Sequence, residues 1–405
     1  MFKVILGQIS PRMNIMLINQ ISVLLTLPFL LSCMSNFGFG LVGTSLIIMQ
    51  AGWVIIDWAS TVYFTEVWRS SFSQLKKNKL VSRHILSRIL LGSLYLIIIC
   101  GAIATKIIIL PWELFFVIIP GILAGGIFPL WFFHVIKKPE ELVGITLFSR
   151  TFFVLMTFWW VKSDADIVTY LALQSFSFSL ITLFALRRMF IFHNLQWQTT
   201  NVSDAIKHIR LNTPYMANTL TNNHIHIFWS LSLSILSGPI VIGLYSIAEQ
   251  AYRAGNTISA TFAQVIRINT IQVKLVNTLP IVLSFIFLVF IIFIAGQWVI
   301  TNILPTYVSN DYTEVLSILK MMLCIWLVQA WIKFINYSIV GKILGIKSLH
   351  RFSLWVILLH LLCIFTWSIN VSTLYSFTEY FLIASILQLL ILISPILRNY
   401  YTSKD

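Results

Sequence analysis

The stretch Leu279-Pro-Ile-Val-Leu-Ser-Phe-Ile-Phe-Leu-Val-Phe-Ile-Ile-Phe-Ile-Ala-Gly-Gln-Trp298 contains no charged side chain. A helix of about 20 apolar residues matches the ~30 Å thickness of the hydrocarbon core of a bilayer. Because that core offers no water to the backbone, its amide and carbonyl groups must bond within the segment, which favours a helix. This stretch therefore predicts a membrane-spanning helix.

Runs of this kind recur along the whole chain. Of its 405 residues, 58% are hydrophobic and only 10% are charged, whereas roughly 25% of the residues of a soluble domain are charged. The alternating pattern of a transmembrane β-barrel, in segments of about 10 residues, is not found. The sequence predicts an all-α polytopic membrane protein with twelve spans, near 14–35, 40–64, 86–104, 113–135, 143–161, 167–186, 212–236, 239–265, 277–300, 313–336, 352–369 and 378–397.

The basic residues indicate how these spans are oriented. If the N-terminus is inside, 21 of the 27 Lys and Arg residues fall in inside segments, Arg88 among them, and only Lys106 and Lys162 fall outside. Cytoplasmic loops are enriched in Lys and Arg in this way. We therefore expect a multi-pass inner-membrane protein with both termini in the cytoplasm and no cleaved signal peptide. The same distribution explains the net charge of +14 without a nucleic-acid partner.

The longest loop divides the chain near its midpoint. We expect an N-terminal six-helix lobe over 1–190, a cytoplasmic, mildly amphipathic loop over 191–211 and a C-terminal six-helix lobe over 212–405. A shift of 200 residues aligns the second span with the eighth, with Gly43 on Gly243 and Gln50 on Gln250. Such parallel repeats occur in transporters, although chance similarity between two small-residue helices is an alternative.

The clearest ionisable residues at membrane depth are Asp57, Arg150, Glu249, Arg253 and Lys333, whereas Lys320 lies nearer the outer part of its span. Because a charge in a bilayer is costly, each of the five at membrane depth is a candidate functional residue. Glu249 and Arg253, four residues apart, share a helix face, as a self-neutralising pair, a cavity lining or both. Arg150 requires a partner from another helix, such as Asp57, or an anionic ligand, unless it anchors the helix at the interface.

Other polar and aromatic residues are candidates for lining a cavity: Trp53, Trp229, His224, His226 and Gln250. The two histidines, two positions apart, face different sides of a helix, so we expect no metal site there.

Several other features of the sequence predict structural roles. No catalytic motif is present, and the four cysteines have no metal-binding or disulfide spacing. We also expect Glu140 and Glu141 to be solvated or to lie at the level of the lipid headgroups. Five tryptophans at span ends, as in an interfacial belt, are Trp131, Trp159, Trp160, Trp298 and Trp367.

Three segments resemble the Wzx-type flippases of bacterial polysaccharide synthesis, within the MATE-like (MOP) exporter superfamily. They are Gln50–Thr61 with Asp57, Phe128–His134 with the helix that carries Arg150, and Gly243-Leu-Tyr-Ser-Ile-Ala-Glu-Gln250. Two residues depart from the family pattern: His134 stands where Gln is frequent, and Gln250 where Lys is frequent. The second departure weakens a substrate-binding role at that position.

The resemblance implies a flippase that moves undecaprenyl-diphosphate-linked oligosaccharide to the periplasmic leaflet for O-antigen or capsule synthesis. Arg150, Arg253 and Lys333 would bind the diphosphate, and Asp57 or Glu249 would couple transport to a proton or sodium ion. No cofactor is expected. A polysaccharide polymerase and a chain-length regulator of the same pathway are the expected protein partners.

Three other functions remain open from the sequence. A MATE-like drug or lipid II exporter would share the architecture. A membrane polymerase or acyltransferase is less favoured, because the large outer loop typical of such polymerases is not found. A channel is less favoured because the polar positions are uneven between spans.

Overall fold

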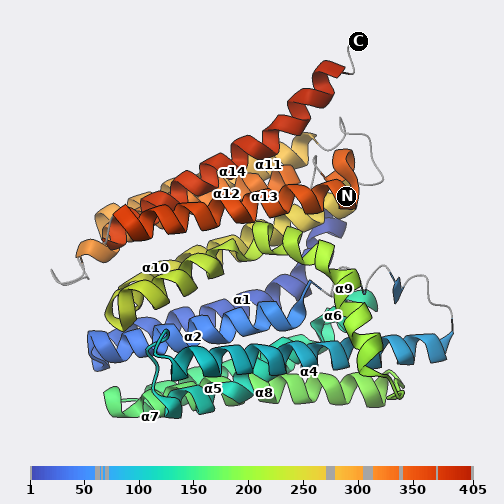
Figure 1. Ribbon diagram of the computed structural model, residues 1–405, viewed down its shortest axis with the longest axis horizontal. Coiled ribbons are helices and arrows are strands. Elements are labelled where there is room, and N and C mark those ends of the chain that lie inside the picture. Colours follow the sequence, from blue (N-terminus) through green and yellow to red (C-terminus); the bar gives the residue numbers. More distant parts are fainter. Residues whose placement is uncertain are drawn as a thin grey trace. The chain divides into compact units, whose positions relative to one another are not determined.

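The computed structural model describes residues 2–59, 64, 67–68, 73–270, 279–303, 313–336, 341–370 and 373–402 (Figure 1). These residues form helices joined by short connections, and no strand occurs among them. Thr61, Arg69 and Lys274, which carried parts of the motif and topology predictions, lie outside the described residues.

The helices of the first half are α1 (Phe2–Cys33), α2 (Asn36–Asp57), α4 (Gln74–Ala104), α5 (Trp112–Ile127), α6 (Leu130–Val135), α7 (Val143–Trp160) and α8 (Ile167–Arg187). Two short 3₁₀ helices, η1 (Pro139–Leu142) and η2 (Asp164–Asp166), precede α7 and α8, and the π-helical turn η3 (Arg188–Phe192) follows α8. The second half contains α9 (Val202–Thr219), the π-helical turn η4 (Leu220–His224), α10 (Ile225–Thr270), α11 (Leu279–Trp298), the π-helical turn η6 (Val299–Ile303), α12 (Thr313–Ile335), α13 (Gly341–Asn370) and α14 (Leu374–Thr402).

The described residues include ten helical stretches long and apolar enough to cross a membrane. One of them, Val202–Ala260, has 59 residues and contains the seventh predicted span and most of the eighth. It is interrupted at Gly238, which has φ 76° and ψ 178° and precedes Pro239. The ninth predicted span coincides with α11. The predicted all-α polytopic architecture is confirmed.

Several span boundaries differ from the predictions for local reasons. The helix α2 ends at Asp57 because Trp58 adopts the left-handed conformation, with φ 44°. The fourth span breaks between α5 and α6, where Phe128 is extended ahead of Pro129. A residue before proline is disfavoured in the helical region. Helix α4 begins at Gln74, twelve residues before the predicted start of its span.

The chain divides into two compact units. The N-terminal unit contains Ile21–Thr219 and His226–Gly243, and the C-terminal unit contains Met1–Gln20, Leu220–Ile225 and Leu244–Asp405. The division into lobes of residues 1–190 and 212–405 stays a prediction.

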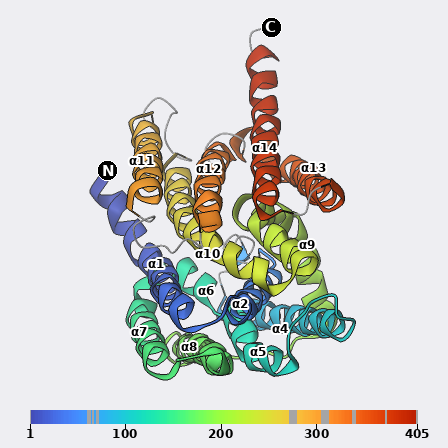
Figure 2. The same cartoon turned by 90° about the vertical axis from the view of Figure 1, so that its left-hand side faces the viewer.

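Within the N-terminal unit, α2 is the central helix (Figure 2). It packs against α4, α5 and α8, and most of its side chains are buried. Small residues permit this close packing, as is common between membrane helices. A Cβ atom on Gly125 of α5, for example, would overlap the indole of Trp53. The core around α2 therefore holds the polar side chains of this helix in defined positions.

Within the C-terminal unit, α12 packs against α14 and α11, and α13 packs against α14. Ile332 of α12 and Leu392 of α14 form a small buried cluster. Two polar residues of α12, Gln329 and Lys333, are buried inside the unit.

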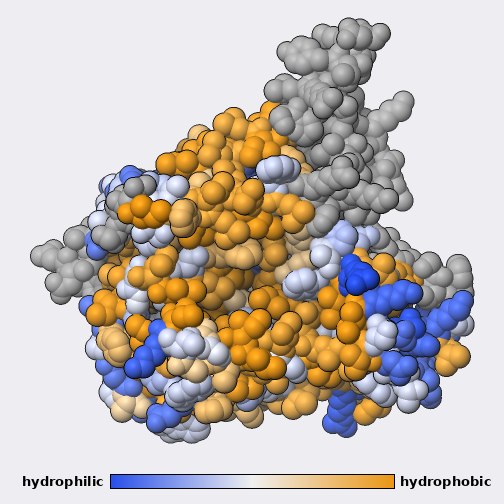
Figure 3. Space-filling view, viewed as in Figure 1, coloured by the Kyte–Doolittle hydropathy of each residue, from blue (hydrophilic) through white to orange (hydrophobic). Residues whose placement is uncertain are grey.

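Large apolar side chains cover much of the visible surface, consistent with contact with lipid tails (Figure 3). Trp159, Trp160 and Trp298 are exposed, as a membrane-interface belt requires. Trp131 and Trp367 are buried, so their assignment to the belt was wrong. They lie at span ends but pack against aromatic side chains, His84 beside Trp131 and Phe377 beside Trp367.

Candidate functional site

The π-helical turn η4 is held by side chains from two other helices of the C-terminal unit. Gln388 of α14 donates its Nε2 hydrogen to the carbonyl oxygen of Thr221 at 3.2 Å, and Asn256 of α10 donates its Nδ2 hydrogen to that of Asn223 at 3.4 Å. Single π-helical turns interrupt the regular helical hydrogen bonds and frequently occur at functional sites. The turn therefore brings its own polar side chains into the interior of this unit.

The most unusual of these interior groups is Lys333 of α12, whose side chain is fully buried. Its Nζ donates a hydrogen bond to Oδ1 of Asn256, a neutral amide. Within the described residues, no carboxylate lies at ion-pair distance from Lys333. One turn further along, Asn336 donates to Oδ1 of Asn222 in η4. A buried ammonium group is thus held by amides rather than by a counter-charge.

Glu249 and Arg253 lie on α10 beside this lysine site. They interact electrostatically, as their spacing of four residues predicted. Glu249 is buried, Arg253 is half-buried, and the Arg253 Nη1 makes no hydrogen bond within the described part of the chain. His224 lies within electrostatic reach of both Arg253 and Lys333.

We call these residues the C-terminal cluster: Asn222, His224, Glu249, Arg253, Asn256 and Lys333. The cluster contains two cationic side chains, Arg253 and Lys333, and one carboxylate, Glu249, which interacts with Arg253. Gln250, the neighbour of Glu249, is also buried. Three of the predicted site residues, Glu249, Arg253 and Lys333, therefore belong to one cluster together with His224.

A second set of polar contacts adjoins η4 and was not foreseen from the sequence. Gln329 donates its Nε2 hydrogen to Ser385 at 3.0 Å and to Gln388 at 3.3 Å, and His360 lies 3.1 Å from the same Gln388 oxygen. All four side chains are buried. These residues could have been noticed in the sequence as polar side chains within apolar runs. They were not selected as candidates because the selection considered mainly ionisable residues.

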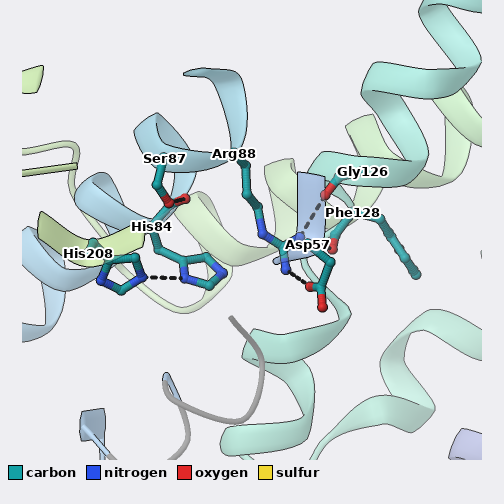
Figure 4. Close-up of polar contacts among 7 residues, drawn as sticks. All are labelled: Asp57, His84, Ser87, Arg88, Gly126, Phe128 and His208. Atoms are coloured by element: carbon teal, nitrogen blue, oxygen red, sulfur yellow. Dashed lines mark hydrogen bonds and ion pairs between the residues drawn. The ribbon is translucent and has the colours of Figure 1, made fainter. Parts of the chain in front are cut away.

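In the N-terminal unit, Arg88 and Asp57 form an ion pair between α4 and α2 (Figure 4). The Arg88 guanidinium also donates to the carbonyl oxygen of Gly126 at 2.8 Å and to that of Phe128 at 3.3 Å. These carbonyls lie at the end of α5, where Pro129 cannot supply an N–H. Arg88 lies within helix α4 and not in a loop, and its side chain is only 2% exposed; its position on the inside stays a prediction. The Arg88 guanidinium therefore pairs with the Asp57 carboxylate and also donates hydrogen bonds to the carbonyl oxygens at the end of α5.

Next to this ion pair, His84 of α4 contacts His208 of α9 (Figure 4). The two ring nitrogens lie 3.2 Å apart, and both side chains are buried. One turn earlier on α9, Asp204 accepts a hydrogen bond from Arg83 at 3.0 Å. These contacts fasten α9 to α4. The histidines stand 124 residues apart in the sequence, so no spacing rule could have paired them.

Arg150 is also buried in the N-terminal unit, at 1% exposure, so its interpretation as an interfacial anchor was wrong. Its Nη1 donates to Gln174 at 3.2 Å, and its guanidinium lies 3.6 Å above the ring of Phe178. Trp53 packs against the same phenylalanine ring and donates its Nε1 hydrogen to the carbonyl oxygen of Gly121. A contact between Arg150 and Asp57 stays a prediction.

The remaining candidates have mixed outcomes. Trp229 and His226 are buried, and Trp53 is half-buried; whether they line a cavity stays a prediction. Glu140 is exposed, as expected, whereas Glu141 is partly buried and Arg188 and His193 contact its carboxylate at 2.8 and 3.1 Å. A position of this pair at the headgroup level stays a prediction. Within the described residues, no group of three or more His, Cys, Asp or Glu side chains could hold a metal ion.

Comparisons with known proteins identify the architecture. No family model and no curated protein matches the sequence. Among solved structures, the chain is similar to a MATE protein in complex with MaD3S, with a TM-score of 0.55 and 13% identity. It is also similar to an outward-facing multidrug resistance MATE family transporter of the MOP superfamily, with a TM-score of 0.54 and 12% identity.

Both similarities cover 100% of this chain and 97% of the other chain. Because they extend over nearly the whole length of both proteins, they reflect a common architecture rather than a shared helix pair. The chain has the fold of the MATE transporters of the MOP superfamily.

Proposed function

We propose that this protein is a flippase that moves undecaprenyl-diphosphate-linked oligosaccharide repeat units from the cytoplasmic to the periplasmic leaflet for surface polysaccharide synthesis. The observation that supports this proposal most is the C-terminal cluster. There Lys333 is buried without a carboxylate partner among the described residues, and Arg253 has a guanidinium nitrogen without a hydrogen bond. Because a charge at membrane depth costs at least ~2.5 kcal/mol, a cationic cluster is best explained by an anionic substrate.

The chemistry of the proposed substrate fits such a cluster. A diphosphate and several sugars cannot cross hydrocarbon without replacement of their hydration, because unpaired polar and charged groups are costly there. Arg253 and Lys333 would offset the diphosphate charge, and the amides of the cluster would accept or donate hydrogen bonds to sugar hydroxyls. Arg offers a planar fork of donors that suits phosphate oxygens, whereas Lys acts as a point charge.

Arg150 is the corresponding cation of the N-terminal unit. Its guanidinium donates to Gln174 and lies over the face of Phe178, and the sequence resemblance implies a diphosphate-binding role for it. We infer that it contributes to diphosphate binding in the same transport cycle. Transport would follow alternating access, as in other carriers built from repeats.

Energy coupling is proposed at a carboxylate, either Asp57 or Glu249. Both lie beside an arginine, Asp57 beside Arg88 and Glu249 beside Arg253. A proton or a sodium ion bound at the carboxylate would compete with that arginine. Coupling to either ion, or downhill transport, is compatible with this arrangement.

A MATE-like drug or lipid II exporter is the second candidate function. The observation in its favour is that one similar structure is a multidrug resistance transporter. The similar structures are transporters and not enzymes, so a polymerase or acyltransferase is the least favoured proposal. For the flippase we propose the bacterial inner membrane, cytoplasmic termini, and a polymerase and chain-length regulator as pathway partners.

The deciding experiment is complementation of a strain that lacks its polysaccharide flippase, with a set of defined repeat-unit pathways. We expect restored surface polysaccharide and no lipid-linked repeat unit accumulating inside. Unchanged polysaccharide with increased drug resistance would contradict the flippase and support the drug exporter. The same strain carrying an established flippase is the positive control.

A further inference from the structure

The segment from the end of α8 through α9, residues 187–211, has two different faces. Its inner face is attached to the rest of the N-terminal unit. Leu195, Ala205 and His208 are buried, and the backbone amide of Gln198 donates to Ser82 at 2.8 Å. With the Arg83–Asp204 and His84–His208 contacts, these interactions give the segment a defined position.

Its outer face combines apolar and basic side chains. The exposed apolar residues, including two large aromatic ones, are Ile191, Phe192, Trp197, Val202, Ile206 and Leu211. Arg187, Lys207 and Arg210 are exposed on the same segment. On α9, the exposed positions 202, 203, 206, 207, 210 and 211 form one continuous stripe, opposite the buried positions 205, 208 and 212. We call this combination the α9 surface.

The exposed charges of the α9 surface are all positive. The acidic residue of the segment, Asp204, is turned toward Arg83 and forms an ion pair with it. In contrast, no ion pair involves Arg187, Lys207 or Arg210 within the described part of the chain. The surface would therefore attract an anionic partner rather than a zwitterionic one.

The orientation of α9 agrees with a position at a membrane surface. Figure 1 shows α9 running across the direction that α4 and α8 follow, at the end of the N-terminal unit where α4 begins. Figure 3 shows hydrophilic residues gathered at this end, next to an apolar band. An amphipathic helix with cations on its polar side and aromatic residues nearby is typical of segments that lie in the headgroup layer.

We propose that the α9 surface is a binding site for acidic phospholipid headgroups, with Lys207 and Arg210 on the phosphates and Trp197, Phe192 and Ile206 in the upper acyl layer. The negatively charged headgroups of acidic phospholipids would neutralise the exposed cations of the α9 surface. Each Lys or Arg near the membrane strengthens the attraction to an anionic leaflet. The site is independent of the transported substrate, so it holds for either candidate function.

The test measures lipid binding to the purified full-length protein by native mass spectrometry, with phosphatidylglycerol and phosphatidylcholine as probes. We expect tighter binding of phosphatidylglycerol, weakened roughly 25-fold at low salt in the double variant Lys207→Gln/Arg210→Gln. The matched control is Lys76→Gln/Lys79→Gln, which removes two exposed cations from the start of α4 at the same end of the unit. This control should change binding less than about threefold, because each cation adds attraction only near the lipid.

Hydrogen–deuterium exchange of residues 191–211 in nanodiscs gives a second readout, which is measured on the wild-type protein and on both variants. Exchange should slow when phosphatidylglycerol replaces phosphatidylcholine, and this slowing should be lost in Lys207→Gln/Arg210→Gln but not in the control variant. Equal binding of both lipids, or equal losses in both variants, would overturn the proposal. Equal protection in both kinds of nanodisc would likewise overturn it, since the segment would then bind lipid without regard to charge.

Discussion

The two units each combine an arginine–carboxylate contact with one further buried cation, but the contact is made in different ways. In the N-terminal unit, Asp57 and Arg88 come from two helices, and Arg88 also bonds two backbone carbonyls. In the C-terminal unit, Glu249 and Arg253 lie on one helix, and the Arg253 Nη1 lacks a hydrogen bond among the described residues.

This difference suggests two testable uses of charge, a structural one for Arg88 and, as we propose, a substrate-binding one for Arg253 and Lys333. Arg88 connects α2, α4 and the end of α5, so its contacts hold three helices together. Arg253 and Lys333 connect less of the structure, because their contacts are within one helix or to a neutral amide. The comparison shows that Arg88 bonds backbone carbonyls as well as a carboxylate, whereas Lys333 bonds a neutral amide; that the second kind of charge serves a ligand is our proposal.

The largest expected effect follows from removal of Arg88. Arg88→Ala would leave Asp57 and the carbonyls of Gly126 and Phe128 without their donor. The Asp57 side chain is 35% exposed, so water would partly replace Arg88 there. A hydrogen bond to a charged group contributes about 1.5–3 kcal/mol, and with two carbonyls also losing their donor we expect the free energy of unfolding to fall by about 2–4 kcal/mol. Denaturation in detergent would measure it. Arg253→Ala is the comparison, and an equal loss there would refute the structural distinction between the two arginines.

The next effect tests the packing of the N-terminal unit. A Cβ atom on Gly40 of α2 would overlap the carbonyl oxygen of Pro239, which belongs to the same unit. Because backbone cannot move aside as a side chain can, Gly40→Ala should cost about 1–3 kcal/mol. Gly101→Ala is the control, since no atom lies within 4 Å of its added methyl group. The melting temperatures of both variants in detergent provide the measurement.

A smaller effect on stability but a clear effect on transport is expected for Lys333→Met. Replacement of a buried charge by an apolar side chain of similar length is often neutral or stabilising, so thermal stability should be unchanged or higher. Export of polysaccharide should fall at least about tenfold, a change of ~1.4 kcal/mol. Quantification of surface polysaccharide, with immunoblots for membrane levels, measures this.

Arg150→Ala and Arg253→Ala should impair export in the same assay. Wild-type export from all three cation variants would assign these residues a structural role.

The smallest effect concerns the histidine contact of the N-terminal unit. A double-mutant cycle of His84→Ala and His208→Ala should give a coupling of about 0.5–1.5 kcal/mol, the net value of one hydrogen bond. In the C-terminal unit, a cycle of His360→Ala and Gln388→Ala is the counterpart. The Gln388 single variant should cost more than the His208 variant, because Gln388 also bonds the Thr221 carbonyl. Similar costs would argue against η4 being held in this way.

The sequence predicted the spans well because about twenty consecutive apolar residues have few other uses in a protein. The ends of the spans were harder to predict, as Asp57 illustrates. Its helix ends because Trp58 takes a left-handed conformation that no spacing rule demands. Pro129, in contrast, was visible, but the prediction continued the fourth span through it.

Polar contacts could be predicted only where both partners lie on one helix. The spacing of four residues alone indicated the Glu249–Arg253 contact. Arg88 and Asp57, 31 residues apart, meet only through the packing of α2 on α4. Likewise, the amide side chains that bond Lys333 and η4 come from other helices. Hydropathy predicts that these helices exist but not how they pack against one another.

The division of the chain between the two units has a consequence for biosynthesis. The N-terminal unit includes His226–Gly243, while the six residues before His226 belong to the C-terminal unit. A ribosome must therefore synthesise 243 of the 405 residues before the first unit has all of its parts. Until then, the surface of Gly40 that Pro239 will cover faces lipid or the insertion machinery. An N-terminal fragment that ends between α8 and α9 would leave this surface of α2 uncovered. We expect it to assemble with the remainder of the chain only when the two fragments are co-expressed.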